Sequence, residues 1–377
     1  MPTPEKRRKV IYIISQIDKA IGFEWITENL DRSRFDLSFI LLNEKPSFLA
    51  QYLTAKNIPV HELAFSGRKQ DLPRLLFKVI NLLRREKPDV IHTHMYIADL
   101  LGQFAGRLLG IKKRVYTRHS SNESRKYHKK QRIDRIVNSL STHVIAISEN
   151  VKNILHKEEN VPLESIRMIH HGFDLESFDN IPRAAIEELE AKYNPQHKKP
   201  VIGVVARYSH WKGIQYAIEA FKKLLADYPN ARLLLANAKK GDYKDEIAAL
   251  LAELPADSYH EIVFEHNLFA LYRLFDVYVH LPIDAELEAF GQTYVEALAA
   301  GIPSVFTNSG VAREFIRHGE NALVVDFQNS AQTYEAILKL LRDDELRKKL
   351  SDNGKLDVKK MFSLKIMIDK MEKLYAE

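Results

Sequence analysis

The sequence contains no cysteine and no long apolar run, and each absence excludes classes of protein. Without cysteine, the chain has no disulfides, no thiolate zinc site and no cysteine nucleophile. No stretch approaches the roughly 20 apolar residues that a membrane-spanning helix needs. The opening MPTPEKRRKVIYIIS places basic residues before a short apolar run without a small-residue cleavage site. We therefore expect a first strand there, not a signal peptide, and a cytoplasmic protein.

The composition is that of a soluble globular protein with a basic balance. The chain has 377 residues, of which 45% are hydrophobic and 28% charged. This length suits two domains of about 150–200 residues each. The net charge of +6 and the pI of about 9.1 suggest an anionic partner, namely a nucleotide, a phospholipid surface or a nucleic acid. A solvated, lysine-rich surface explains the same balance equally well.

Short apolar runs alternate with amphipathic helical patterns through the first half. Residues 72–86 place apolar side chains at helical spacing, and Lys87-Pro88 ends that pattern. Apolar and β-branched runs typical of buried strands lie at residues 10–14, 39–42, 89–94, 115–117 and 143–147. This alternation predicts an α/β fold with a parallel, doubly wound sheet.

The alternation of short apolar runs and amphipathic helical segments is interrupted and then resumes. This predicts a second domain of the same architecture. Expected strands of this second series lie at residues 201–205, 233–235, 262–264, 277–279, 304–306 and 323–325. We expect an N-terminal domain over residues 1–180, a linker over 181–199, a C-terminal domain over 200–360, and a last helix over 361–377 that packs back on the first domain. Ligands of such sheets bind beyond the carboxyl ends of the strands.

Two cations of the second half are candidates for binding a diphosphate. Arg207 follows an expected strand, and Lys212-Gly213 leads into an expected helix over 214–225. A guanidinium, an ammonium and a helix N-terminus that converge on one spot suit a pyrophosphate. Two surface cations beside a turn are the alternative interpretation.

Two carboxylates further on are candidates for binding hydroxyl groups. Glu288 lies in an expected loop and Glu296 in the helix that follows, and carboxylates accept hydrogen bonds from paired hydroxyls of a ribose or a sugar. Gly291 between them permits close approach of a ligand to a helix start. Glu296 also fits an ordinary charged residue on a helix face.

The segment EAFGQTYVEALAAGIPSV resembles the E-x7-E signature of the family-four retaining glycosyltransferases, which have the GT-B fold. The resemblance extends over most of the chain in the same order. It is carried by Gly22-Phe23-Glu24, KPDVIHTHMYIADLLG, Thr117-Arg118-His119, VIAISENVKNIL, IHHGFDLESF and VARYSHWKGIQYAIEAF. We therefore expect two Rossmann-like domains of the GT-B type and a hexosyltransferase activity.

The resemblance implies a role for each matched position on the donor side. Arg207 and Lys212 would bind the donor diphosphate, Glu296 the ribose and Glu288 the transferred sugar. The first domain would contribute His119 as a contact to the sugar. Glu288, His119, Arg207 and Lys212 are thus the expected catalytic residues. The backbone at Phe290, Gly291 and Gly22 would complete the donor site.

The expected co-substrate is a UDP-sugar, with GDP-mannose next, and the expected acceptor is a cell-surface polysaccharide, a lipopolysaccharide or a glycolipid. Glu24, His92 and His94 are expected on the acceptor side. Retention in this family is usually explained by front-face attack, in which a phosphate oxygen takes the acceptor proton. No Asp-x-Asp motif is present, so we expect no metal requirement and no cofactor.

The sequence also departs from the family pattern. Ala20-Ile21-Gly22 keeps one of the two glycines usual in the first loop, and His171 stands where an asparagine is usual. The glycines usual after the strands near Leu235 and Phe264 are absent. The second of these regions normally meets the base, so no preference for a base transfers.

Several alternatives stay open at this point. His92 and His94 fit a metal site poorly, because no third ligand lies nearby in the sequence. The basic segment 112–135, with Tyr116, Tyr127 and His128, would suit a lipid-linked acceptor or an anionic membrane face, or is simply solvated. We expect no nucleic-acid partner, since no recognised module is present. A same-fold epimerase and a nonenzymatic glycan-binding homologue remain the alternative functions.

Overall fold

The computed structural model describes residues 7–121 and 128–377, which divide into two compact units. The first unit ends at Phe173 and resumes at Leu364, and the second is Asp174–Ser363. The boundary therefore falls before the linker expected at 181–199. That segment contains a helix, α8 (Arg183–Tyr193), which packs against α11 (Leu268–Tyr272) of the second unit.

The first unit is built on a parallel sheet with the strand order β3-β2-β1-β4-β5-β6-β7. All strand pairs run parallel. The strands are β1 (Arg8–Ser15), β2 (Phe35–Asn43), β3 (Val60–Ala64), β4 (Val90–His94), β5 (Lys113–Arg118), β6 (His143–Ala146) and β7 (Ile166–Met168). The expected strands are present, and β3 and β7 are additional. Both additions lie at sheet edges, where the apolar pattern that marks a strand is weakest.

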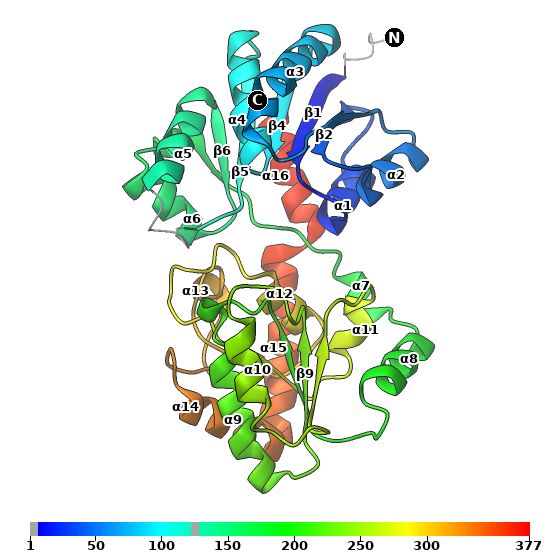
Figure 1. The fold of residues 1–377 in the computed structure, drawn as a ribbon, viewed down its shortest axis with the longest axis vertical. Coiled ribbons are helices and arrows are strands. Elements are labelled where there is room, and N and C mark those ends of the chain that lie inside the picture. The colour runs from blue at the N-terminus through cyan, green and yellow to red at the C-terminus, as the bar shows by residue number, and fades with distance from the viewer. Residues whose placement is uncertain (1–6, 122–127) are drawn as a thin grey trace. The chain divides into compact units, whose positions relative to one another are not determined.

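The helices of the first unit cover this sheet on both sides, as its continuous apolar strands require. Residues 10–14 of β1 are fully buried, so neither face of the central strand meets water. The helices are α1 (Ile21–Asn29), α2 (Phe48–Ala55), α3 (Leu72–Glu86), α4 (Tyr96–Leu108), α5 (His128–Leu140), α6 (Glu149–Asn153) and α16 (Leu364–Ala376). The helix α16, red in Figure 1, lies beside α1 and β1 although it ends the chain.

The second unit repeats the architecture with the strand order β10-β9-β8-β11-β12-β13, again parallel. Its strands are β8 (Val201–Val205), β9 (Arg232–Ala236), β10 (Tyr259–Ile262), β11 (Val277–His280), β12 (Ser304–Phe306) and β13 (Leu323–Val324). The strand expected at 262–264 is wrong in its position. The strand β10 ends at Ile262, and Val263 and Phe264 beyond it are exposed.

The remaining helices of the second unit complete a second doubly wound domain. They are α7 (Glu176–Asp179), α9 (Ile214–Asp227), α10 (Lys244–Leu251), α12 (Gln292–Ala299), α13 (Ala312–Phe315), α14 (Ser330–Arg342) and α15 (Asp344–Phe362). One core of buried side chains joins α9 and α14 to the central strands. Two parallel doubly wound sheets confirm the fold class that the alternating pattern predicts. None of the helices in the described ranges combines the length and apolar character of a bilayer crossing.

Candidate functional site

The strand order of the second unit places its ligand site between β8 and β11. Chain connections leave in opposite directions from these two neighbouring strands, and open α/β sheets bind ligands in the crevice at such a point. Arg207 follows the end of β8, and its side chain is exposed. Lys212 ends a short 3-10 turn, His210–Lys212, directly before α9. Both expected cations therefore lie at the loop that follows β8.

Gly213 fixes how close this loop lies to β11. Its φ is +69°, and a Cβ at this position would lie 1.7 Å from the carbonyl oxygen of Leu281. Glycine is therefore required both for the left-handed backbone and for the close approach. The start of α9 is thereby held against Leu281, which follows the carboxyl end of β11.

Lys212 and Glu288 form an ion pair. Lys212 Nζ lies 2.6 Å from Glu288 Oε2, and both side chains are largely buried. His280, the last residue of β11, places Nε2 3.3 Å from the same oxygen. Burial by itself raises the pKa of Glu288, but Lys212 and the contact with His280 outweigh this effect and lower the pKa to about 2. Glu288 is thus a buried, fully ionised acceptor at neutral pH.

A second glycine, Gly310, lies close against the loop that carries Glu288. At Gly310, where φ is +55°, a Cβ would lie 2.9 Å from both the Cβ and the carbonyl oxygen of Glu288. Val311 N donates to the carbonyl oxygen of Phe290 at 3.0 Å, and the Phe290 ring is buried against Phe362. Phe290 therefore acts as a packing residue whose backbone lies at the site.

Gly291 begins α12 in the left-handed region, with φ of +86°. Within that helix, Glu296 accepts a 2.8 Å hydrogen bond from the Tyr272 hydroxyl, and burial raises the pKa of Glu296 to about 7. Glu296 is therefore not the solvated helix-face residue that the sequence left open. The two carboxylates differ in charge state because Glu288 has a cationic partner and Glu296 has a neutral one.

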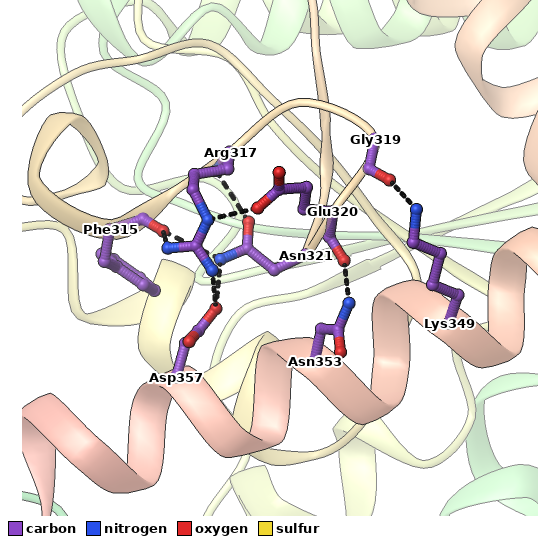
Figure 2. Close-up of polar contacts among 8 residues, drawn as sticks. All are labelled: Phe315, Arg317, Gly319, Glu320, Asn321, Lys349, Asn353 and Asp357. Atoms are coloured by element: carbon purple, nitrogen blue, oxygen red, sulfur yellow. Dashed lines mark hydrogen bonds and ion pairs between the residues drawn. The ribbon is translucent and has the colours of Figure 1, made fainter.

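The chain after α13 is fixed to α15, which stabilises the Gly310 loop from its far end. Arg317 forms an ion pair with Asp357 at 2.7 Å, and Asn321 donates to the same carboxylate at 2.8 Å (Figure 2). Two further side chains of α15 hold carbonyl oxygens of this loop: Lys349 donates to Gly319 and Asn353 to Glu320 (Figure 2). These contacts anchor the segment that returns from the site to β13.

In the first unit, histidines gather where β4 and β5 end. His94 Nδ1 lies 3.0 Å from His119 Nε2. The ring of His119 stacks on that of His171, with centroids 5.5 Å apart and planes inclined by 8°. The structure thus brings together His94 and His119, which the sequence singled out. It adds His171, which the sequence showed only as a departure from the family pattern.

His92, expected on the acceptor side, is buried in the interior of the first unit. Its side chain is 1% exposed and lies between the Tyr375 hydroxyl, 2.6 Å from Nδ1, and Thr117 Oγ1, 2.8 Å from Nε2. Tyr375 belongs to α16 and also contacts Tyr12 through the two hydroxyls at 2.6 Å. Nothing in the sequence indicated this network beyond the expectation that the last helix packs on the first domain.

Burial keeps these histidines neutral. It lowers the pKa of His119 to about 4, and it lowers the pKa of His92 and of His171 to about 3. A neutral imidazole both donates and accepts a hydrogen bond, which suits a contact to a sugar hydroxyl. No group of three or more His, Asp or Glu side chains that could hold a metal ion occurs in the described residues.

Gly22 and Glu24 lie in the first turn of α1, where a glycine loop was expected. Gly22 has open space around the position of a Cβ and no positive φ, so nothing in its surroundings requires glycine. Glu24 is half-buried at the positive end of the helix. The backbone at this position is the start of a helix.

The structure describes only part of the basic segment 112–135. Tyr127 and residues 122–126 lie outside the described residues, as does the side chain of His128. Tyr116 is buried, and Arg118 forms buried ion pairs with Asp134 at 3.0 Å and Glu159 at 2.9 Å. These two basic-segment side chains belong to the interior and are not available to phosphates of a membrane or an acceptor.

Sequence comparison matches the chain to two family descriptions in succession. Residues 26–177 match Glycosyltransferase Family 4, and residues 185–357 match Glycosyl transferases group 1. The chain is 26% identical over 360 residues to the capsular polysaccharide biosynthesis glycosyltransferase CapM of Staphylococcus aureus, covering 86% of this chain and 91% of that protein. It is 21% identical over 310 residues to the N-acetyl-alpha-D-glucosaminyl L-malate synthase of Bacillus anthracis, covering 80% and 78%.

Structural comparison gives the same fold. A glycosyltransferase from Rickettsia africae aligns with a TM-score of 0.82 at 20% identity, over 98% of each chain. Anabaena HepE in complex with UDP-glucose aligns with a TM-score of 0.80 at 21% identity, over 98% of this chain and all of that one.

Proposed function

Since the chain belongs to the family-four glycosyltransferases and is a sugar-transferring enzyme with the GT-B fold, we propose that it uses a nucleoside diphosphate sugar as donor. A UDP-sugar is the first choice and GDP-mannose the second. The observation that carries this proposal is the buried Lys212–Glu288 ion pair at the β8–β11 crevice, where Lys212 comes from the loop after β8 that also carries Arg207. It supplies cations for a diphosphate and an ionised acceptor for sugar hydroxyls in one place.

The proposed chemical role of these residues is to stabilise the leaving group, which is the nucleoside diphosphate. As the bond from the sugar anomeric carbon to the β-phosphate oxygen breaks, negative charge grows on the diphosphate. Arg207, Lys212 and the N-terminus of α9 supply preorganised positive charge where that growth occurs. The start of α12 at Gly291 contributes further amide donors. We propose that these groups suffice without a metal ion, and assays in chelator test this.

Lys212 has two anionic partners in this account. Without donor it pairs with Glu288. With donor bound, its ammonium also faces the diphosphate, and Glu288 accepts hydrogen bonds from hydroxyls of the transferred sugar. Glu288 remains charged during this exchange because its pKa, about 2, lies far below neutrality. Glu296 receives the ribose hydroxyls.

We propose retention of anomeric configuration by front-face attack. The acceptor hydroxyl forms its bond to the anomeric carbon on the face from which the diphosphate leaves, and its proton passes to a phosphate oxygen. The proposed contribution of His119 is a hydrogen bond from a neutral imidazole to the sugar. His94 and His171 hold this ring in place.

The proposed acceptor is a hydroxyl of a polysaccharide or glycolipid. The support is the relationship to CapM, whose description is capsular polysaccharide biosynthesis. Lipopolysaccharide as acceptor and a cytoplasmic location at the inner face of a membrane remain predictions. The names of the relatives differ, one being a capsular polysaccharide biosynthesis glycosyltransferase and another an L-malate synthase, and the fold does not select among acceptors.

The test uses purified protein with a polysaccharide or glycolipid acceptor and a panel of UDP-sugars and GDP-mannose in chelator, and measures release of the nucleoside diphosphate as the sugar passes to the acceptor hydroxyl. The expected result is release from one donor, abolished in Glu288→Ala and in Arg207→Ala and unchanged in the surface control Lys360→Gln. The assignment would be overturned if no donor released its nucleoside diphosphate. It would also be overturned if Glu288→Ala, Arg207→Ala and Lys360→Gln released equal amounts. Appearance of an isomeric nucleotide sugar without released diphosphate would instead identify the epimerase alternative.

A further inference from the structure

His280 ends β11, after the buried apolar and aromatic residues 277–279. It is 2% exposed, and its imidazole packs edge-on against the ring of Tyr294, with centroids 4.7 Å apart and planes inclined by 79°. The Tyr294 hydroxyl donates to the carbonyl oxygen of Thr307 at 2.9 Å, which fixes that ring in turn. The imidazole therefore has a defined place in the interior of the second unit.

The two ring nitrogens of His280 have opposite surroundings. Nε2 lies 3.3 Å from Oε2 of Glu288, and an ionised carboxylate only accepts hydrogen bonds, so Nε2 carries the proton and donates. Burial lowers the pKa of His280, although the contact with Glu288 opposes this effect, so the ring is neutral and Nδ1 carries no proton. Nδ1 is buried and has no hydrogen-bond partner among the described residues.

The unpartnered Nδ1 shows that packing alone does not account for a histidine at this position. A buried acceptor without a donor lowers stability. A leucine would fill the end of an apolar strand without leaving such an atom. What histidine adds here is the N–H that it directs at Glu288.

The loop that joins His280 to Glu288 is fixed independently of the ion pair with Lys212. Two hydroxyl groups that follow β12 donate to carbonyl oxygens of this loop: Thr307 to Pro282 at 2.7 Å and Ser309 to Asp284 at 2.6 Å. The ring is held by its packing and the loop by these bonds. The contact between His280 and Glu288 therefore does not require Lys212.

From this geometry we infer that His280 is a positioning residue for sugar transfer, which holds the Glu288 carboxylate in the orientation that receives the donor sugar. The inference rests on the proposed function. When Lys212 is shared with the diphosphate, Glu288 loses part of the charge that compensates its burial. The N–H of His280 keeps its bond to Oε2 during this exchange. Because the ring is neutral, it adds no positive charge that would repel Lys212.

The tautomer of His280 gives the first test. In protein labelled with nitrogen-15 at histidine, comparison of the wild type with His280→Gln identifies the signals of this ring. The expected result between pH 6 and 8 is a proton on Nε2 and none on Nδ1, both without ligand and at saturation with UDP. A proton on Nδ1 in either state would overturn the inference, because the contact with Glu288 would then be absent or the ring charged.

Kinetics distinguish positioning of Glu288 from a structural role. His280→Leu removes the N–H at similar side-chain volume, whereas His280→Gln retains an N–H donor on a side chain that reaches as far as Nε2. We expect His280→Leu to lower kcat about 10- to 100-fold, the effect of one hydrogen bond to a charged group. The Kd for UDP, measured by calorimetry, is expected to stay unchanged because UDP carries no sugar. His280→Gln is expected to recover most of the lost kcat.

His260→Leu is the matched control, since it makes the same change at a half-buried histidine of β10 in the same sheet. It is expected to leave kcat unchanged, and melting temperatures verify the folding of every variant. The tautomer measurement tests the inference even where His280→Leu does not fold.

The inference alone would be overturned by wild-type kcat in His280→Leu, by equal losses of kcat in His280→Leu and His280→Gln, or by an equal loss in His260→Leu. A loss of UDP affinity in step with kcat would also overturn it. A wild type that neither binds UDP nor transfers sugar would instead overturn the proposed function, and the inference with it.

Discussion

Lys212 and Glu288, 76 residues apart in the sequence, form a 2.6 Å ion pair in the interior of the second unit. A buried carboxylate is costly unless a cation and hydrogen bonds compensate it. Here Lys212 compensates Glu288 in the ligand-free protein and is also the cation proposed to meet the donor diphosphate. Stability and donor binding therefore depend on the same pair of side chains.

The first prediction concerns removal of one partner. Lys212→Met leaves Glu288 buried without its cation, and we expect a loss of about 3 kcal/mol in the free energy of unfolding. The double variant Lys212→Met/Glu288→Gln removes both charges and is expected to recover most of that loss without recovering donor binding. Denaturant unfolding monitored by circular dichroism measures the free energy of unfolding of both variants and of the wild type. A single variant as stable as the wild type would show that the pair contributes little.

The second prediction concerns pH. The pKa of Glu296 lies at about 7, so its carboxylate gains charge as pH rises from 6 to 8. If it accepts hydrogen bonds from the ribose, UDP affinity should rise over this interval by up to about tenfold. Calorimetric titration at several pH values measures the change. Glu296→Gln has no such titration, so its profile isolates the effect from ionisation of the nucleotide.

The same raised pKa has a consequence for stability. In the unfolded chain the pKa is near 4.5, so between pH 4.5 and about 7 the folded protein binds more protons at Glu296 than the unfolded chain does. The contribution of this residue to stability is therefore largest below pH 4.5 and falls as pH rises toward 7. We expect the melting temperature of the wild type to fall relative to that of Glu296→Gln as pH rises over this range. The difference between the two melting temperatures therefore narrows or reverses. A pH-independent difference would contradict the shift.

The third prediction contrasts two glycines. Gly213→Ala must hold a left-handed backbone and displace the Leu281 carbonyl, so we expect a loss of at least about 2 kcal/mol and weakened donor binding. Gly22→Ala meets open space in the first turn of a helix and is expected to be neutral or to stabilise by about 0.5–1 kcal/mol. Unchanged UDP affinity in Gly22→Ala would remove Gly22 from the donor site.

The fourth prediction concerns the last helix. Tyr375→Phe removes the hydroxyl that contacts both Tyr12 and His92, leaving buried polar atoms unpaired. We expect a cost of about 1–3 kcal/mol in the stability of the first unit. A control on the same helix, Lys370→Gln, changes an exposed side chain and should leave stability unchanged. A loss of the same size in both variants would mean that the helix, and not the hydroxyl, is responsible.

The sequence predicted the sheets well because buried parallel strands are continuous apolar runs, as residues 10–14 show. It placed Arg207, Lys212 and Glu288 near one another because strand ends converge in such sheets. It could not show that Lys212 and Glu288 pair directly, since that contact depends on the loop between β11 and α12. A polar residue that ends an apolar strand was the available signal for His280, but nothing marked Tyr272 as the partner of Glu296.

The differences between the sequence predictions and the structure have related physical causes. His92 lies on the central strand β4 between Ile91 and Thr93, and the pattern along this strand does not reveal its contact with Tyr375 of α16. Gly22 was expected in a loop, yet a single glycine does not prevent a helix from beginning at Ile21. The compact units divide at Phe173 and not at the expected residue 180, and the charged helices α7 and α8 beyond this point resemble a linker in composition.

Calorimetric titration of UDP into the purified protein in the presence of chelator measures whether the β8–β11 crevice binds a diphosphate without a metal ion. We predict binding to one site in the wild type, and its loss in Arg207→Ala while the melting temperature of that variant stays unchanged, because Arg207 is an exposed side chain. Binding that survives in Arg207→Ala, or that disappears on addition of chelator, would contradict a metal-independent diphosphate site at the β8–β11 crevice.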